Sequence, residues 1–195
     1  MKRSLTKIVL GFLLASMPLI AADSNYRYDS YSLFAVEGGY TTTNADVATA
    51  GGTYDVQETG MGNVGLKLGA QTENYRVFFS ARHFLAEDFS KFNTLGAEVQ
   101  YMFNFSKYAN FFIGANGGAA FMKIASTTNY ASVSSTSTYF GGDAGFNIHV
   151  SKTVDFELGA KYMAVDFNEV VGPDTYSVDG IFTGYASVII KWKMD

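Results

Sequence analysis

The chain has few side chains of the kinds that perform catalysis or bind transition metals. Its 195 residues include two histidines and no cysteine. His83 stands near Glu87 and Asp88, and a histidine paired with a carboxylate can act as a general base. No nucleophile stands at a recognisable spacing from it. Two scattered histidines without cysteine also argue against a transition-metal site, so we expect no catalytic residues, no metal and no other cofactor.

The charged residues are spaced more regularly. Within segments in which every second residue is apolar, the positions between hold four acidic and four basic residues: Glu37, Lys67, Arg76, Arg82, Glu98, Asp143, Glu157 and Lys161. A closed interior requires such a balance, because an unpaired buried charge is strongly destabilising. We therefore predict a structural charge network inside the fold, with Glu98 level with Arg82 on the preceding segment.

Eight alternating segments are available to position these charges. They cover residues 31–42, 60–71, 75–85, 92–104, 109–124, 137–149, 154–167 and 180–193. Each spans roughly the ten residues that a tilted strand needs to cross a bilayer. The links are alternately short (72–74, 106–108 and 151–153) and long (43–60, 86–91, 125–137 and 168–179). This pattern predicts an all-β fold, an eight-stranded antiparallel up-and-down transmembrane β-barrel with short periplasmic turns.

The glycines indicate which face meets lipid. One face of the segments is apolar, with residues such as Leu95 and Val99, whereas the other mixes charges with many glycines, such as Gly96 and Gly114. A face in water has no steric need for these glycines, which weaken strand interiors. The interior of an eight-stranded barrel is only just wide enough for its own side chains. We therefore expect lipid on the apolar face and charges in the lumen, with a soluble periplasmic barrel as an alternative.

Aromatic residues gather towards both ends of the segments. Tyr75, Phe103, Phe105, Tyr108 and Trp192 stand near the short turns, and Tyr40, Phe84, Phe89 and Tyr139 near the long links. Two such groups are typical of the aromatic girdles at the two membrane surfaces.

The N-terminus has the three parts of a secretory signal peptide: a basic start, a mostly apolar run over 8–20 and a small-residue exit at Ala21-Ala22. We expect a signal peptide over 1–22 cleaved near Ala22, a short lead over 23–30 and the barrel over 31–195. Cleavage removes three of the 14 basic residues and none of the 18 acidic ones, which leaves a net charge of −7. Because of this negative charge, we expect the chain to bind nucleic acid poorly.

The pattern of most of the mature chain, roughly residues 30–193, resembles the small eight-stranded outer-membrane barrels, such as the transmembrane domain of outer membrane protein A and the opacity-like surface proteins. The stretch from Leu33 to Thr41 resembles their first strand, and that from Gly184 to Trp192 their closing strand. The resemblance implies localisation in the outer membrane of a Gram-negative cell, with outer-membrane lipid and lipopolysaccharide as neighbours.

The closing strand of that family also serves as an insertion signal for the barrel-insertion machinery. The resemblance assigns this role to Val188, Ile190 and Trp192. The family usually ends on its last aromatic residue and has a glycine five residues before it. Here Lys193 follows Trp192, and Ser187 stands in place of the glycine.

The sequence His149-Val150-Ser151 superficially resembles the His-x-Ser motif of the lipid A deacylase family. That family continues with asparagine, whereas Lys152 follows here. The strand pattern also puts His149 at a periplasmic turn, away from the outer leaflet that contains lipid A. We therefore expect a protein that is not an enzyme.

These observations predict a non-enzymatic outer-membrane protein with a role in envelope integrity or surface interaction. The longest links, 43–60 and 125–137, are rich in Thr, Ser, Asn, Ala and Tyr and would contact host or surface ligands, since binding residues concentrate on loops held by a rigid scaffold. A small low-conductance pore is the alternative, and a lipid A-modifying enzyme the second alternative.

Overall fold

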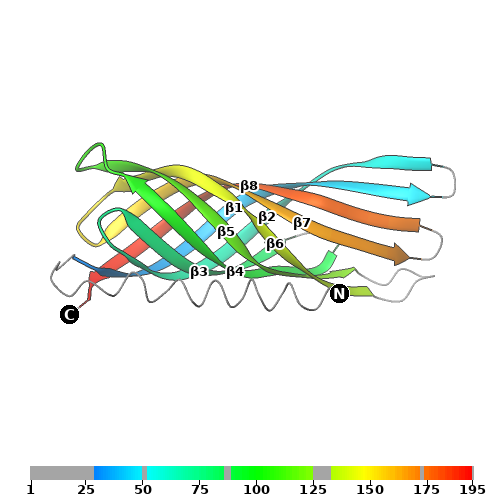
Figure 1. Ribbon diagram of the computed structural model, residues 1–195, viewed down its shortest axis with the longest axis horizontal. Helices are drawn as coiled ribbons and strands as arrows, with labels where there is room; N and C mark the ends of the chain where they lie inside the picture. The colour runs from blue at the N-terminus through cyan, green and yellow to red at the C-terminus, as the bar shows by residue number, and fades with distance from the viewer. Residues whose placement is uncertain (1–28, 50–51, 86–88, 125–132, 172–173, 195) are drawn as a thin grey trace, which may run out of the picture.

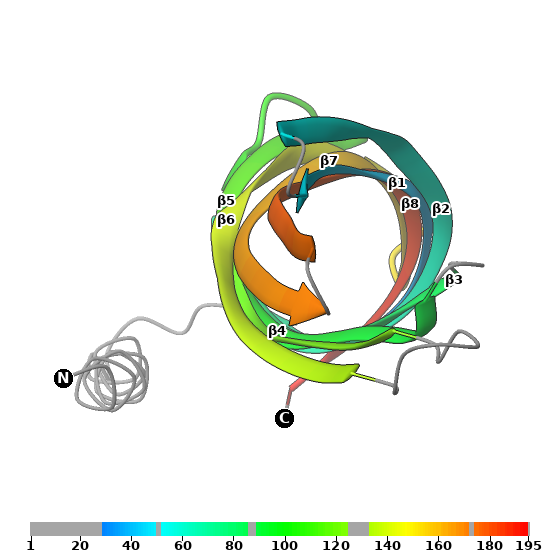
Figure 2. The same cartoon turned by 90° about the vertical axis from the view of Figure 1, so that its right-hand side faces the viewer.

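A computed structural model describes residues 29–49, 52–85, 89–124, 133–171 and 174–194, and its strands form one closed barrel (Figures 1 and 2). The strands are β1 (Tyr31–Thr49), β2 (Gly52–Gln71), β3 (Tyr75–Leu85), β4 (Phe89–Phe103), β5 (Ala109–Ile124), β6 (Val133–His149), β7 (Val154–Val171) and β8 (Asp174–Lys193). Each pairs antiparallel with the next, and β8 pairs with β1. The predicted fold is confirmed. Within the described ranges, no helix has the length and apolar character needed to cross a bilayer.

The predicted signal peptide lies outside the described residues, as does most of the predicted lead, of which only Asp29 and Ser30 are described.

The strand ends at the short turns agree with the prediction to within one residue, and so do the opposite ends of β3 at Leu85 and of β5 at Ile124. The opposite ends of the other six strands do not. The predicted loops 43–60 and 168–179 are wrong, because β1 continues to Thr49 and β7 to Val171. Val47 pairs with Tyr54 on one side and with Tyr176 on the other. Strand pairing on both sides therefore satisfies the backbone N–H and C=O groups of β1 and β8 in these segments. Of the predicted loop 125–137, residues 133–137 belong to β6 and the rest lie outside the described part.

Four neighbouring strands extend together past the point where the barrel closes, and β5 and β6 extend separately from them, paired to each other, to Ile124 and Val133. Pairing between β2 and β3 stops at Gly62 and Leu85, and pairing between β6 and β7 stops at Tyr139 and Val165. Beyond these points the order β7-β8-β1-β2 continues as a separate sheet, which projects to the right in Figure 1. We call residues 44–49, 52–61, 166–171 and 174–179 the outer sheet. We assign it to the cell exterior, because the short turns of outer-membrane barrels face the periplasm.

The two faces of the barrel wall are as predicted. Apolar side chains cover the outside, and Leu66, Leu95 and Ile113 each leave more than half of their surface exposed. At the short-turn end Tyr75, Tyr101 and Phe103 meet edge to face, with centroids 5.2 and 4.8 Å apart. This exterior suits contact with hydrocarbon rather than water.

The aromatic girdle predicted at the opposite end is wrong in two of its members. Tyr40 is exposed on the outside, but Phe84 and Tyr139 are buried inside the barrel. Phe84 follows Arg82 by two residues, and alternate residues of a strand point to the same side. The side chain of Phe89 lies outside the described part.

Candidate functional site

The lumen of the barrel is filled by the charged side chains predicted from the sequence. All eight are buried, with at most 4 % of any one exposed. We call these eight residues the lumen network: Glu37, Lys67, Arg76, Arg82, Glu98, Asp143, Glu157 and Lys161. They come from six strands, β1, β2, β3, β4, β6 and β7, so their contacts connect strands that are not neighbours in the wall.

Glu98 on β4 is one centre of the lumen network. It accepts hydrogen bonds from Arg82 on the adjacent strand β3 and from Lys161 Nζ on β7 at 2.6 Å. The predicted level is wrong, because Glu98 stands opposite Phe78 and Arg82 opposite Thr94, and the long side chains make the contact. Lys67 Nζ lies 3.7 Å from its second carboxylate oxygen. Since β4 and β7 are not neighbours, the bond to Lys161 crosses the lumen.

Lys67 on β2 is the second centre, because its ammonium group meets three carboxylates. Its Nζ lies 2.5 Å from Glu37 and 3.2 Å from Glu157, besides the longer contact with Glu98. Glu37 also accepts a 2.5 Å hydrogen bond from Arg82 Nε, and Glu157 pairs with Arg76. Three carboxylates and four cationic groups are thus interlocked, which offsets the cost of removing them from water.

Asp143 joins the lumen network through an amide rather than through an ion pair. Gln100 Nε2 donates to Asp143 at 2.5 Å, and Gln100 Oε1 accepts from Arg76 Nε at 2.7 Å. None of the ion pairs within the described segments includes Asp143. The predicted charge network therefore includes one acid that is joined to a base only through the amide of Gln100.

Glycines on the inner face provide the space for these long side chains. A Cβ on Gly114 would lie 2.7 Å from Gln100 Cγ, and one on Gly65 would lie 3.0 Å from Arg82 Cγ. Both distances are shorter than ordinary contacts, so a larger residue would displace a member of the lumen network or its amide partner.

Apolar side chains close the lumen on the outer side of the lumen network. We call this cluster the outer plug: Met61, Phe84, Phe92, Ala120, Met122, Tyr139, Met163, Val165 and Ile181. Its centre includes the stacked rings of Phe84 and Phe92, whose centroids are 4.3 Å apart. The sequence analysis missed this cluster, although the alternation pattern places its residues on the inner face.

Smaller apolar clusters lie towards the periplasmic end of the lumen: Leu33, Ala35, Phe78 and Ile189 in one, and Met102, Phe112 and Tyr185 in the other. The Arg76 guanidinium lies between two of their rings, 5.1 Å from the centre of Phe78 and 5.2 Å from that of Phe112. Cation–π contacts of this kind favour a cation away from water.

A polar cluster at the periplasmic mouth was also missed. Asp155 is fully buried, and its two oxygens lie 2.7 and 2.9 Å from Lys191 Nζ. His149 Nδ1 lies 2.9 Å from Asp155, and His149 Nε2 lies 3.4 Å from Asn110 Nδ2. The hydroxyl of Ser151 contacts Thr153 instead. The histidine therefore braces β6 against β7 and shows no contact with a nucleophile.

The other candidates for chemistry are isolated. His83 is exposed, and its Nδ1 lies 2.7 Å from Asn93 Oδ1, whereas Glu87 and Asp88 lie outside the described part. A search of the described residues finds no cluster of three or more His, Asp or Glu side chains that could hold a metal ion.

The proposed insertion signal lies on the lipid side of β8. Val188, Ile190 and Trp192 each leave about half of their surface exposed, so these side chains are accessible along one face of the closing strand. Their role in insertion stays a prediction.

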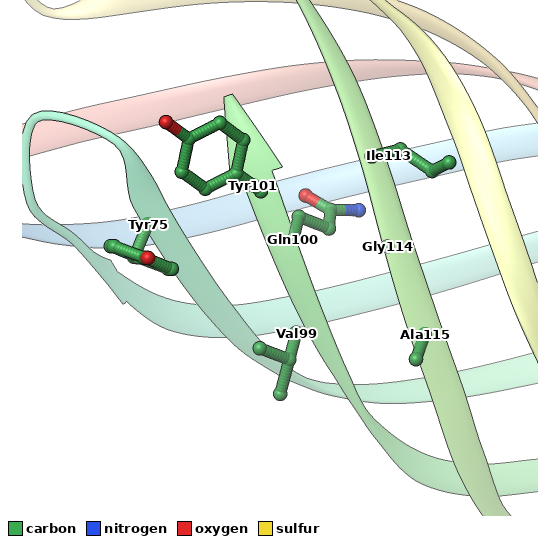
Figure 3. A pocket seen from close by; sticks show the side chains of 7 residues that line it. All are labelled: Tyr75, Val99, Gln100, Tyr101, Ile113, Gly114 and Ala115. Carbon is green, nitrogen blue, oxygen red and sulfur yellow. The ribbon is translucent and has the colours of Figure 1, made fainter. Parts of the chain in front are cut away.

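A hollow of about 250 Å³ lies on the barrel wall between β3, β4 and β5 (Figure 3). Its lining residues are Tyr75, Val99, Gln100, Tyr101, Ile113, Gly114 and Ala115. Ala115 pairs with Val99, and Ile113 with Tyr101, so the hollow exists because a small residue stands among larger ones. It opens towards lipid, and its lining has no charged side chain.

Comparison with known proteins agrees with this architecture. The sequence model of the family described as type IX secretion system membrane protein PorP/SprF matches residues 23–193. No curated protein matches the chain.

Solved structures of small outer-membrane barrels are similar in fold. Neisserial surface protein A is 18 % identical with a TM-score of 0.60, over 82 % of this chain and 97 % of that one. The N-terminal barrel domain of Pseudomonas aeruginosa OprF is 11 % identical with a TM-score of 0.55, over 85 % and 98 %. OprG from Pseudomonas aeruginosa is 13 % identical with a TM-score of 0.50, over 85 % and 99 %. The likeness to these structures is one of fold, and together with the match to a family of membrane proteins it indicates an integral outer-membrane β-barrel.

Proposed function

Because the chain belongs to the PorP/SprF family of type IX secretion system membrane proteins, we propose that it is a non-enzymatic, non-conducting scaffold of the outer membrane. In this role the closed barrel anchors the protein, and the parts beyond the membrane contact other proteins at the cell surface. The partners that the family description suggests are components of a secretion machinery. The observation that carries the proposal is the filled lumen.

The lumen network argues against the pore alternative. Ions would have to pass between side chains that are almost completely buried and bonded across the barrel, such as Lys161 and Glu98. They would then have to pass the outer plug, where Phe84 and Phe92 are stacked. Moving an ion through such an apolar layer requires that it lose its hydration.

The arrangement of the histidines supports a role without catalysis. His149 lies at the periplasmic end and is bonded to Asp155 and Asn110, and His83 contacts an asparagine. A catalytic base needs to lie within hydrogen-bond reach of the proton that it removes. Neither arrangement offers a nucleophile to the outer leaflet.

Planar-bilayer recording of the purified protein tests the scaffold proposal. We expect no stepwise current in the wild type. Reproducible stepwise openings would refute the non-conducting role and favour the small pore. A double variant of the outer plug, Phe84→Ala with Phe92→Ala, serves as the positive control for a loosened lumen, provided that it still shows heat-modifiable gel migration.

A gene deletion tests the remaining parts of the proposal. We expect impaired secretion of type IX cargo, or increased sensitivity to detergent, in cells without the gene, with unchanged masses of lipid A by mass spectrometry. Complementation with the intact gene should restore the wild-type behaviour. Altered lipid A masses would instead support the enzyme alternative, and a wild-type phenotype in both assays would contradict the scaffold role.

A further inference from the structure

Among the residues that the structure describes, the outer sheet has a free edge on each side. Residues Gly52–Met61 of β2 pair with β1 alone, because pairing with β3 begins only at Gly62. On the other side, β7 pairs with β8 alone beyond Val165. In an antiparallel strand, alternate residues direct their N–H and C=O groups away from the neighbouring strand. Each free edge is therefore a template on which another extended segment can pair.

The regular part of each edge has the length of an ordinary strand. On β2 a bulge interrupts the register with β1 between Val56 and Thr59, and regular pairing continues from Val56 to Gly52. On β7 a similar irregularity lies between Ala164 and Phe167. The five residues Gly52–Val56 contain neither proline nor lysine, the residues that commonly protect an edge from pairing.

The charge of the outer sheet is entirely acidic. Its segments contain seven acidic residues and no lysine or arginine: Asp46, Asp55, Glu58, Asp166, Glu169, Asp174 and Asp179. The chain as a whole has 14 basic residues against 18 acidic ones, so this imbalance is local. It favours a partner with positive charge.

The register identifies the edge at which that charge is least compensated. Asp46 of β1 stands directly opposite Asp55 of β2, and like charges opposite each other destabilise an antiparallel pair. On the other side, Glu169 of β7 stands opposite Tyr176. A basic residue on a strand added beside Asp55 would relieve the repulsion, whereas no two acids stand opposite each other along the regularly paired part of the β7 edge, from Phe167 to Val171.

We propose that the β2 edge at Gly52–Val56 binds an extended, lysine- or arginine-bearing segment of a partner protein, which adds a strand to the outer sheet. A second copy of this chain does not fit the β2 edge, because its outer sheet has the same acidic residues and no basic residue. The inference rests on the proposed scaffold function and specifies the chemistry of the partner.

Peptide binding to the refolded full-length protein in micelles tests the inference. The probe is acetyl-Lys-Val-Lys-Val-Lys-amide, and its control has the same sequence with N-methyl groups on alternate residues. The control retains the charge but loses backbone donors. We expect the control to bind about tenfold more weakly. Equal binding of the two peptides would overturn the proposal, because it would show that charge alone accounts for binding. Absence of binding by the probe would also overturn it.

Matched variants locate the edge. Asp55→Asn should weaken binding of the probe about tenfold, whereas Glu169→Gln on the β7 edge should leave it unchanged. The opposite result would overturn the assignment to β2. Heat-modifiable gel migration should show that both variants fold.

Cross-linking provides the register. The chain has no cysteine, so Thr53→Cys and Tyr54→Cys each introduce a single thiol. The probe is prepared with its one cysteine at each position in turn. Each protein variant should form a disulfide mainly with one of these positions, and the preferred position should differ between the two variants. Uniform cross-linking at all positions, or dimers of Thr53→Cys without peptide, would overturn the proposal. Stepwise conductance would refute the scaffold function without affecting these binding results, and failed peptide binding by a non-conducting protein would refute the β2 edge alone.

Discussion

In the closed part of the barrel every strand has a neighbour on both sides, whereas in the outer sheet β2 and β7 have only one neighbour among the described residues. The closed part encloses side chains from all eight strands. The outer sheet is held by pairing among β7, β8, β1 and β2. The barrel is therefore suited to stable insertion in the membrane, and the outer sheet is suited to pairing with another chain.

The charges of the two regions differ in the same way. In the lumen network each carboxylate of Glu37, Glu98 and Glu157 meets two or more cationic groups. In the outer sheet seven acids stand without a lysine or arginine in the same segments. A buried charge needs a partner within the protein, whereas an excess of charge of one sign favours a partner of the opposite charge. Four substitutions test this contrast.

Glu98→Leu should have the largest effect. It leaves Arg82 and Lys161 with fewer acceptors inside the barrel, and removal of one partner of a buried ion pair costs about 3–5 kcal/mol. We expect the free energy of unfolding in urea, measured in lipid vesicles, to fall by that amount. Val99→Leu, on the adjacent lipid-facing position, should be nearly neutral. Equal effects of the two would mean that the faces of β4 are reversed.

Phe84→Ala should be next in size. It removes the ring that stacks on Phe92 at 4.3 Å in the outer plug, and large-to-small changes of buried phenylalanine cost about 3 kcal/mol or more. Phe79→Ala, at a position of the same strand that is 59 % exposed, should cost less in the same unfolding assay. A larger loss for Phe79 would show that the outer plug does not contribute to stability.

Gly114→Val should have a moderate effect. The new side chain would meet Gln100 Cγ and Asp143 Oδ1, which lie 2.7 and 2.9 Å from the position of a Cβ. Overpacking of this kind costs about 1–3 kcal/mol. Ala115→Val points into the hollow of Figure 3 and should be tolerated. If both variants unfold at the same urea concentration as the wild type, the lumen beside Gly114 has space for a larger side chain, and the prediction is wrong.

Asp55→Asn should have the smallest effect. It lies in the outer sheet opposite Asp46, and loss of this repulsion should change the free energy of unfolding by no more than about 0.5 kcal/mol, towards greater stability. The gain should disappear at high salt, because exposed charges are screened. A loss of more than 1 kcal/mol, on the order of a buried polar contact, would show that Asp55 has a stabilising partner within the chain.

The sequence was sufficient to predict the wall and the composition of the lumen network. Alternation located the strands, and the combination of glycines with balanced charges identified the inner face. The particular contacts could not be predicted from the sequence, because they depend on how strands such as β4 and β7 face each other across the barrel. Even the contact of Glu98 with Arg82 does not follow from the register of neighbouring strands, because Arg82 pairs with Thr94 and the contact depends on the length of the two side chains.

The errors have physical causes. Outside the membrane a strand has no need of an apolar face, so the polar ends of β1 and β7 carry the composition of loops. Phe84 and Tyr139 were assigned to a girdle by residue type, although their position in the alternation places them inside. The periplasmic cluster of Asp155, Lys191 and His149 depends on three side chains from three strands, which no pattern within one segment predicts.

The junction between β8 and β1 has a consequence for the order of the strands. At its periplasmic end, Met194 N donates to Ser30 O at 2.9 Å, and Lys193 Nζ lies 2.6 Å from Asp29. A few added residues would join the chain here into a ring, and cutting at the turn 72–74 would yield a circular permutant that retains every strand pair. The finished cylinder thus has no first or last strand, and the present order matters for biogenesis rather than for the native structure.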